Sequence, residues 1–510
     1  MKSRNIPVFI PNGSGLRPAA DGCPSGSSGP ANTASVTGMT LVAGVDSSTQ
    51  STKVLLVRAE DGAVVAAASA PHPDGTECPP DRWREALSAA GHGLLERADA
   101  VGVAAQQHGM VTLDDAGAVV RPAMLWNDVK SARQAADLIT EFGGAAEWAA
   151  RTGSVPTMSF TVTKLRWLAE REPRHAARVR RVVLPHDWLT WRLAGGGPRD
   201  AGGDPSLEPV TDRGDASGTG YFSPASGEWL PDWAARALGH PVELPRVAAP
   251  GEITGRTAWG AAVSAGTGDN MGAALGMGIG DGDVAVSIGT SGTAYAVTGQ
   301  PSADPTGMVS GFADATGRFL PLACTLNAAR VLDVTARMLG VDVAGLSDLA
   351  LKAEPGAGGL VLLPYLDGER TPNRPAANGV LRGLTTSNAT PENLARAAVE
   401  GVMCSLADAV DALRPCGISP SRILLTGGAA RSDAVRSIAP GIFGLPVVVP
   451  EAAEYVALGA ARQAAWALSG TAEPPAWPAR PSTTHETPAA AEVREQYAAL
   501  RDDAAAWQVS

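Results

Sequence analysis

The stretch LVAGVDSSTQSTKVLLVRA, residues 41–59, runs from an apolar segment through small hydroxyl residues into a second apolar segment. Residues 41–46 end on Asp46 and predict a buried strand, because a short apolar run bounded by turn residues is typical of one. Residues 51–59 predict a second strand, and the polar residues between the two supply the turn. AVVAAASA at 63–70 predicts a third strand. From residue 41 the chain is therefore expected to open with an antiparallel meander.

A second hairpin pattern lies about midway through the chain, in DVAVSIGTSGTAYAVTG at residues 283–299. It predicts a strand, a turn of glycine and hydroxyl residues, and another strand. A duplicated α/β domain explains the likeness of the two hairpins, and so does chance similarity between two turns rich in small residues. RILLTGGAAR at 422–431 predicts a further strand, a Gly-Gly turn and the start of a helix. Together with a mostly helical stretch at 130–195, these patterns indicate a mixed α/β protein.

Length, charge and cysteine content narrow the class of protein. The 510 residues suffice for two to three domains of ~100–200 residues each. The formal net charge of −11 argues against non-specific binding to nucleic acid or to an anionic membrane. It does not exclude ATP, because backbone N–H groups can build a phosphate site. No apolar stretch approaches the ~20 residues of a membrane helix, and five cysteines without metal-ligand spacing suit a reducing compartment, so a cytoplasmic location is expected.

The two ends of the chain differ in composition from the rest. Residues 1–38 are rich in Gly, Ser, Pro and Ala and predict a disordered leader, because they offer little to bury. Met39 stands immediately before the first strand and is a candidate functional start. Residues 469–510 become rich in proline and are expected to form a C-terminal tail that ends in a short helix.

The turn after Asp46 has a composition suited to phosphate. Small side chains let backbone N–H groups approach a phosphate closely, and hydroxyl groups add hydrogen bonds. The Asp46 carboxylate could hold Mg²⁺, directly or through water, since Mg²⁺ prefers a few carboxylates together with water and phosphate oxygens. A plain hairpin whose turn begins with an aspartate is the alternative interpretation.

Two glycine-containing turns further along could also contact a nucleotide. Gly289 and Gly292 bracket Thr290 and Ser291, so this second hairpin could hold a polyphosphate from the side opposite the first. The pair 427–428 follows a strand and opens a helix, where a ribose or a flat ring can approach the backbone. An ordinary hairpin turn and an ordinary strand-to-helix turn remain as alternatives.

The segment Gly266-Thr267-Gly268-Asp269-Asn270 places a carboxylate on a glycine-rich turn before a helix rich in Gly and Ala. A carboxylate held there could take the proton of a hydroxyl group during phosphoryl transfer, a reaction that depends more on positioning than on strong basicity. The alternative is that Asp269 only caps the helix that follows it.

Taken in order, these segments resemble the FGGY family of carbohydrate kinases. The resemblance covers about residues 41–468 and rests on GVDSSTQSTKV, AAQQHGM, MLWNDVKS, LPHDWLTWRLAG, TDRGDASGTGYF, GTGDNMGAALGMG, VSIGTSGTAYAV, LPYLDGERTPNRP and LLTGGAARSDAVR. It implies an α/β fold with two actin-like, ribonuclease H-type domains and an active-site cleft between them. The N-terminal domain is expected at 41–277, with sugar and phosphate sites, and the C-terminal, nucleotide-binding domain at 283–468. Duplication then becomes the favoured origin of the two hairpins.

The resemblance also implies individual roles. Asp269 stands where the family has its catalytic base, which accepts the proton of the sugar hydroxyl as that oxygen attacks the γ-phosphate of MgATP. The implied ATP and phosphate contacts are Asp46, Thr49, Gln50, Lys53, Gly289, Thr290, Ser291, Gly427, Gly428 and Ser432, with Asp46 also near Mg²⁺. The implied sugar contacts are Gln107, His108, Gly109, Asp128, Asp269 and Asn270. Glu369 and Arg370 form a candidate ion pair without an assigned role.

The turn at residues 106–109, Gln-Gln-His-Gly, bears on the substrate. It resembles the Gln-Met-His-Gly turn of family members that phosphorylate xylulose, whereas glycerol kinases have an Arg-Glu pair there. The expected reaction is therefore conversion of D-xylulose to D-xylulose 5-phosphate with ATP and Mg²⁺. Gln107 replaces the usual Met, which leaves ribulose or another ketose or polyol as alternatives. Ser47 and Ser48 also replace a residue pair that usually contains glycine.

Two other classes of protein compete with a sugar kinase. An actin-like ATPase of another kind is disfavoured by the motifs AAQQHGM and MLWND, and a catalytically inactive sugar sensor is disfavoured by the presence of Asp269. The expected partners are the small sugar and ATP, with no nucleic acid and no membrane. The sequence leaves the oligomeric state open, with a homodimer among the arrangements considered.

Overall fold

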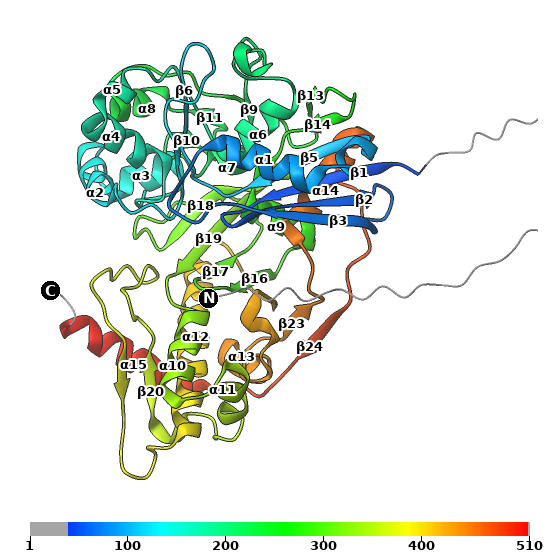
Figure 1. The fold of residues 1–510 in the computed structure, drawn as a ribbon. Coiled ribbons are helices and arrows are strands. Elements are labelled where there is room, and N and C mark those ends of the chain that lie inside the picture. The colour runs from blue at the N-terminus through cyan, green and yellow to red at the C-terminus, as the bar shows by residue number, and fades with distance from the viewer. Residues whose placement is uncertain (1–38, 508–510) are drawn as a thin grey trace, which may run out of the picture. The chain divides into compact units, whose positions relative to one another are not determined.

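The computed structural model describes residues 39–507, so the leader predicted at 1–38 lies outside the described residues. Two large mixed sheets form the framework of the described part (Figure 1). The first has the strand order β13-β14-β5-β1-β2-β3, with β15 paired to β5. Its strands are β1 (Leu41–Ser47), β2 (Ser51–Arg58), β3 (Val64–Pro71), β5 (Ala100–Ala105), β13 (Ile253–Arg256), β14 (Ala262–Ser264) and β15 (Thr267–Gly268). Because β1, β2 and β3 pair antiparallel in sequence order, the predicted opening meander is confirmed.

The second sheet has the order β18-β19-β17-β16-β22-β23-β24. Its strands are β16 (Asp283–Ile288), β17 (Gly292–Tyr295), β18 (Val309–Ala313), β19 (Phe319–Thr325), β22 (Arg422–Thr426), β23 (Val447–Pro450) and β24 (Ser482–His485). Each sheet contains an antiparallel hairpin, β1–β2 or β16–β17, whose first strand also pairs in parallel with a later strand, β5 or β22. This shared arrangement supports duplication rather than chance as the origin of the two hairpins.

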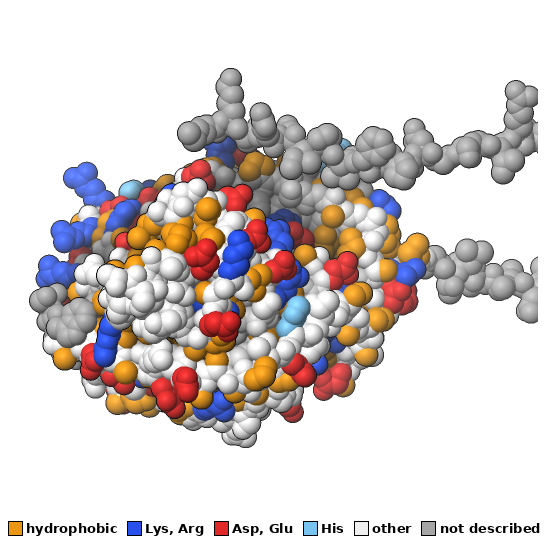
Figure 2. All heavy atoms as spheres, turned by 90° about the horizontal axis from the view of Figure 1, so that it is seen from below, with side chains coloured by type: hydrophobic (Ala, Val, Ile, Leu, Met, Phe, Trp, Pro, Cys, Tyr) orange, Lys and Arg blue, Asp and Glu red, His pale blue; other side chains and the backbone are white. Residues whose placement is uncertain are grey.

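Helices cover both sheets (Figure 1). They are α1 (Pro80–Gly91), α2 (Ala132–Glu141), α3 (Ala145–Thr152), α4 (Thr161–Arg171), α5 (Pro173–Ala176), α6 (Pro185–Leu193), α7 (Arg213–Ala216), α8 (Pro231–Leu238), α9 (Asp269–Met277), α10 (Ala329–Leu339), α11 (Val343–Ala350), α12 (Pro391–Ala412), α13 (Asp433–Phe443), α14 (Tyr455–Ser469) and α15 (Ala491–Trp507). None within residues 39–507 is both long and apolar enough to cross a membrane. On the face shown in Figure 2, acidic and basic side chains are interspersed.

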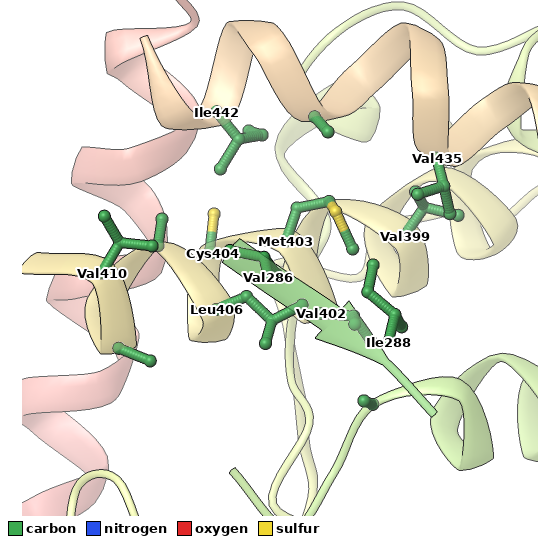
Figure 3. Packing of buried hydrophobic residues seen from close by; sticks show 14 of the residues in the cluster. Val286, Ile288, Val399, Val402, Met403, Cys404, Leu406, Val410, Val435 and Ile442 are labelled. Carbon is green, nitrogen blue, oxygen red and sulfur yellow. The ribbon is translucent and has the colours of Figure 1, made fainter. Parts of the chain in front are cut away.

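The core beneath the second sheet forms where β16 meets α12 and α13 (Figure 3). Val286 and Ile288 of the strand, Val402 and Met403 of α12 and Val435 of α13 are all fully buried. Removing such a side chain from water contributes about 1.5–3 kcal/mol each. This packing fixes the strand that leads into the second hairpin turn.

The segment 469–510, expected to be a tail with a short helix, contributes to the second sheet and its surroundings. β24 pairs antiparallel with β23, and α15 is 17 residues long. β24 has the sequence STTH, with three exposed side chains and one partly exposed. An edge strand with no buried face has no apolar alternation, so its local pattern does not predict a strand.

Helix α14 lies in the chain between β23 and β24 of the second sheet but packs on the first sheet, beside β1 and β5 (Figure 1). Glycines permit the close approach: a Cβ on Gly44 would lie 1.9 Å from the carbonyl oxygen of Ala457, and one on Gly102 would lie 2.2 Å from that of Ala460. Gly459 of α14 likewise meets Gly272 of α9. Helix α14 therefore supports both the first strand of the first hairpin and the helix that begins at residue 269.

Candidate active site

A cavity of about 210 Å³ is lined by residues from both halves of the described chain. From the first half it is lined by Gln107, His108, Trp126, Ser159, Asp269 and Asn270. From the second half it is lined by Ser291, Thr293, Phe312, Leu322, Cys324 and Arg370. The structure thus brings together predicted sugar contacts, the predicted base and a residue of the second hairpin turn.

Asp269 is the first residue of α9, and its carboxylate faces this cavity. Oδ1 accepts hydrogen bonds from the backbone N–H of Asn270 at 2.8 Å and from its side-chain amide at 3.0 Å. Burial, and then the negative charges of Asp46 and Asp215, raise the pKa of Asp269 to about 7. The N-cap position belongs to Gly268, so helix capping does not explain this aspartate. A carboxylate with this pKa is suited to accept a proton near neutral pH.

His108 has a backbone φ of +65°, which is rare for a residue with a side chain. Left-handed backbone costs about 1–2 kcal/mol, and its surroundings hold the residue there. Nδ1 lies 2.6 Å from the carbonyl oxygen of Gly218, and the ring packs against Phe160 with centroids 4.8 Å apart. Burial, followed by the charge of Lys164, lowers the pKa of His108 to about 3. A neutral ring that donates from Nδ1 leaves Nε2 free to accept a hydrogen bond from a hydroxyl group.

Lys164 of α4 supports the same turn through hydrogen bonds, a role that the sequence did not predict. Its buried ammonium donates to the carbonyl oxygen of His108 at 2.8 Å and to that of Ser159. Burial lowers the pKa of Lys164 to about 7, against the opposing charge of Asp128. In the sequence this lysine is one polar residue in a helical segment, and its partner lies 56 positions away.

Gln107 and its neighbours show which predicted sugar contacts face the cavity. Gln107 Oε1 accepts from the Asn270 amide at 2.9 Å, and its Nε2 is buried without a hydrogen-bond partner among the described residues. That N–H group can donate to a ligand hydroxyl. Gly109 is not among the residues lining the cavity, and a Cβ there would lie 2.5 Å from Pro185. Its role in the structure is close packing against α6.

Asp128 is also absent from the cavity lining. Its buried carboxylate accepts from Thr76 Oγ1 at 3.1 Å and from the backbone N–H of Lys130 at 2.9 Å. These bonds anchor the loop, so a contact of Asp128 with the sugar stays a prediction. Trp126, in the same loop, does line the cavity and donates from Nε1 to Thr49 Oγ1 at 2.8 Å. The loop thereby connects the cavity with the first hairpin.

Asp46 lies buried near the end of β1, at the first hairpin turn. Ser48 Oγ donates to Oδ1, and Lys53 Nζ lies 3.8 Å from Oδ2 but 2.6 Å from a carboxylate oxygen of Glu454. Burial raises the pKa of Asp46, and the bond from Ser48 and the charge of Lys53 oppose that rise. No residue from 47 to 50 has left-handed backbone, which explains why two serines can stand where glycine is usual. Gln50, at the tip of the turn, is exposed.

The second hairpin turn and the Gly-Gly turn lie side by side. The N–H of Gly289 donates to the carbonyl oxygen of Ser291 at 3.1 Å, and Thr290 is exposed between them. Gly427 has φ +90°, and a Cβ there would lie 2.6 Å from the carbonyl oxygen of Ile288. Around Gly428 the space is open. Exposed backbone of both turns is therefore available to one ligand.

Ser432 and Glu369 have structural partners. Ser432 is the N-cap of α13, accepts from the N–H of Val435 at 3.5 Å and donates to Ser347 Oγ at 3.2 Å, so its contact with nucleotide stays a prediction. Glu369 accepts from the backbone N–H groups of Leu326 at 2.6 Å and Arg370 at 2.7 Å. Its side chain forms no ion pair with the guanidinium of Arg370 among the described residues. Arg370 instead lines the cavity, a role that the sequence did not indicate.

Comparison with known proteins agrees with this geometry along nearly the whole described chain. Residues 41–286 match the N-terminal domain of the FGGY family of carbohydrate kinases, and residues 284–468 match its C-terminal domain. The chain belongs to this family. It is therefore a phosphotransferase with a carbohydrate acceptor and ATP as the phosphoryl donor, and the predicted fold of two actin-like domains is confirmed.

Individual relatives are similar over most of their own length. A xylulose kinase of Streptomyces coelicolor is 49% identical over 447 residues, covering 84% of this chain and 88% of the relative. A xylulose kinase of Escherichia coli is 35% identical and covers 82% and 89%. The crystal structure of xylulose kinase from Bifidobacterium adolescentis superimposes with a TM-score of 0.86 at 46% identity, covering 91% of this chain and 99% of that one.

Proposed function

We propose that the chain catalyses the ATP-dependent phosphorylation of D-xylulose to D-xylulose 5-phosphate. The observation that carries the proposal is the single cavity where Asp269, Gln107 and His108 meet Ser291 of the second hairpin turn. Such a cavity can hold the hydroxyl-rich acceptor on one side and the terminal phosphate on the other. The likeness to relatives named xylulose kinase, up to 49% identical, supports xylulose as that acceptor.

The chemistry follows from the side chains that face the cavity. The C5 hydroxyl of the sugar donates its proton to the Asp269 carboxylate while its oxygen forms a bond to the γ-phosphorus, and the bond from that phosphorus to the β,γ-bridging oxygen breaks to release ADP. His108 Nε2 accepts from one sugar hydroxyl, and Gln107 Nε2 donates to another. Asn270 holds the base in place through its two hydrogen bonds to Asp269 Oδ1.

The two halves of the chain divide the binding work. Residues 41–277 supply the sugar contacts and the first hairpin, whose Thr49, Gln50 and Lys53 face the phosphates. Residues 283–468 supply the second hairpin, with Gly289, Thr290 and Ser291 toward the phosphates, and the turn at 427–428 toward the adenosine. The exposed backbone of both of these turns, described above, supports this assignment.

Asp46 and its surroundings fit a magnesium ion bound with the nucleotide. The charge of Asp46 raises the pKa of Asp269, and the Lys53 ammonium beside Asp46 is shared with Glu454. This excess of buried negative charge suits a divalent cation, which Asp46 would hold directly or through water. When bound, Mg²⁺ neutralises charge on the phosphate oxygens. Asp46 then serves to orient the nucleotide relative to the cavity.

A coupled assay of ADP release tests the proposal, with D-xylulose compared against D-ribulose, glycerol and aldopentoses. We expect turnover that depends on D-xylulose and falls about 10²–10⁴-fold in Asp269→Asn, because the general base is lost while the shape is kept. ATP binding, measured by calorimetry, should persist in that variant. Sugar-independent hydrolysis in the wild type would favour an actin-like ATPase of another class, and an active Asp269→Asn would exclude this residue as the base.

Because of Gln107, another ketose or a polyol remains an alternative substrate that the assay should include. Its unpaired, buried Nε2 adds a hydrogen-bond donor to the cavity. A sugar with a differently placed hydroxyl group can use that donor, so the same substrate panel should be run with Gln107→Met. If the preferred sugar changes in that variant while ATP binding does not, Gln107 determines which ketose is accepted.

A further inference from the structure

His186 stands at the centre of a buried charged network that neither the fold nor the proposed reaction explains. It is the second residue of α6 and is fully buried. Its Nδ1 lies 2.6 Å from Asp215 Oδ2, and its Nε2 lies 3.2 Å from Asp187 Oδ1. Both aspartates are also fully buried. One imidazole ring is thus flanked by carboxylates at both of its nitrogens.

The ring carries a positive charge in this arrangement because three carboxylates surround it. Nδ1 makes a hydrogen bond to Asp215, whereas Nε2 has a charge contact with Asp187 but no hydrogen-bond partner among the described residues, and it lies 4.0 Å from Asp212 Oδ1. Burial alone would lower the pKa of His186, but the charges of Asp187 and Asp215 outweigh it and raise the pKa to about 9. A shared metal ion does not suit the geometry, because ligand atoms each about 2 Å from one ion lie about 3 Å or more from each other, which exceeds the 2.6 Å between Nδ1 and Oδ2.

The network touches the segment that carries the proposed base. Gly266, three residues before Asp269, has φ +75°, and a Cβ there would lie 2.5 Å from His186 Cδ2. Thr267 Oγ1 donates to Asp212 Oδ2 at 2.8 Å. Asp212 in turn accepts from the backbone N–H of Asp215 at 2.8 Å, which joins the two aspartates into one unit. The ring and its partners therefore support β15 directly behind the first turn of α9.

The network also acts on the base through charge. The carboxylate of Asp215 is one of the groups that raise the pKa of Asp269, after burial and Asp46. The other titratable groups that face the ring or the base are Asp46, Asp187, Asp212, Tyr221 and Tyr295, and His108 and Arg370 line the cavity with the base. All except His108 and Arg370 are acids, and His186 supplies the positive charge between two of them. Without it the same space would hold more negative charge beside Asp269.

We propose that His186 is a positioning residue for phosphoryl transfer. Its imidazolium holds Asp215 against the strand that leads into Asp269 and compensates negative charge that would otherwise oppose ionisation of the base. This inference rests on the proposed function, since it concerns the step in which Asp269 accepts a proton. It assigns a role in that step to the motifs LPHDWLTWRLAG and TDRGDASGTGYF, which carry the ring and Asp215.

Three variants separate charge from packing in the pH profile of kcat/KM for the sugar. The acid limb of that profile falls where Asp269 becomes protonated. His186→Gln removes the positive charge and should move the limb to higher pH by about one pH unit, the effect of a unit charge roughly 12 Å away at an effective dielectric constant of about 20. His186→Lys keeps the charge and should restore the wild-type position. Asp215→Asn keeps an oxygen acceptor but removes a negative charge, and should move the limb down.

The outcomes are distinguishable from failure of the proposed function. Absence of sugar-dependent turnover in the wild type would refute that function, whereas an active wild type with an unshifted limb in folded His186→Gln would refute the role of His186. Equal shifts in the Gln and Lys variants would assign the effect to packing. If His186→Gln does not fold, as judged by its melting transition, Asp215→Asn still tests the inference. An acid limb that moves to lower pH in that variant would support the role of the network, and an unmoved limb would refute it. Independently of activity, ¹⁵N NMR of labelled histidine should show both His186 nitrogens protonated at pH 8, and a neutral ring there would overturn the inference.

Discussion

The two hairpins have the same topology but opposite chemistry. The first turn, after Asp46, has a buried carboxylate, a neighbouring Lys53 and hydroxyl side chains, and it needs no left-handed backbone. The second turn, after Ile288, has no charged residue and is built around glycines. Its backbone at Gly289 is open enough that the nearest atom to an added Cβ would be 3.5 Å away. One hairpin can therefore act through charge and the other through its exposed backbone.

This division teaches that duplication conserves geometry more strictly than chemistry. In both sheets the hairpin pairs antiparallel while its first strand pairs parallel with a later strand. In the first sheet α14 packs beside the hairpin strand and also against α9, which begins with Asp269. The copy that carries the proposed base is also the copy with the charged turn. The second copy is free to serve the phosphates and the nucleotide alone.

Between the two turns, the largest effect should follow from removing charge in the first one. In Asp46→Asn we expect kcat to fall about 10²-fold or more, because positioning of a divalent cation contributes several kcal/mol to such a reaction. The Mg²⁺ concentration needed for half-maximal rate should rise as well. Steady-state kinetics across a Mg²⁺ series, with MgATP binding by calorimetry, would measure both.

Glu454→Gln is the matched control for that experiment, because it frees Lys53 from its 2.6 Å partner and leaves Asp46 intact. It should change the Mg²⁺ requirement less than Asp46→Asn does, because the carboxylate that would hold the ion is kept. If Asp46→Asn keeps the wild-type Mg²⁺ dependence, the first turn does not act through a bound cation, and the contrast between the hairpins is one of composition only.

Local patterns predicted the features that neighbouring residues determine. Both hairpins, the mixed α/β class and the turn that carries Asp269 can be read from runs of apolar, hydroxyl and glycine residues. Features that depend on distant partners could not be predicted. Lys164 is buried beneath His108, 56 residues away, and His186 pairs with Asp215, 29 residues away. Nothing beside either residue in the sequence indicates those contacts.

Asp128 shows that a family motif can also predict a contact that the structure does not place in the cavity. Asp128 matches a family motif, yet its oxygens bind Thr76 and Lys130 and it does not line the cavity. Resemblance places a residue in a segment, but which way its side chain is engaged depends on the loop's other contacts. Arg370 is the converse case, because it lines the cavity although no role was predicted for it. Its neighbour Glu369 is buried and accepts a hydrogen bond from the backbone N–H of Leu326.

A smaller effect should follow from adding a side chain at Gly289 in the second turn, where the backbone is exposed. Gly289→Ala leaves the unbound fold intact, since the added Cβ meets only ordinary van der Waals contact. It should raise KM for ATP about tenfold, the cost of about 1.4 kcal/mol, because phosphate can no longer approach the N–H groups closely. Ser48→Ala in the first turn is the comparison, and KM for ATP should change less there. An equal response of both turns would remove the distinction between charge and backbone.

The most specific effect concerns Lys164, which supports the His108 turn on the sugar side of the cavity. Its pKa is lowered to about 7 in the folded protein, against about 10.5 in an unfolded chain. Between these values the unfolded state binds more protons than the folded state, so Lys164 makes the free energy of unfolding rise with pH from about 7 to about 10. Lys164→Met should flatten that rise and increase KM for the sugar about tenfold while KM for ATP stays constant, because only the His108 turn loses its support. Thermal unfolding across this pH window would test the first point. An unchanged slope in the variant would mean that Lys164 is not buried in the form described, and a rise in KM for ATP would show that the brace serves both hairpins rather than the sugar side alone.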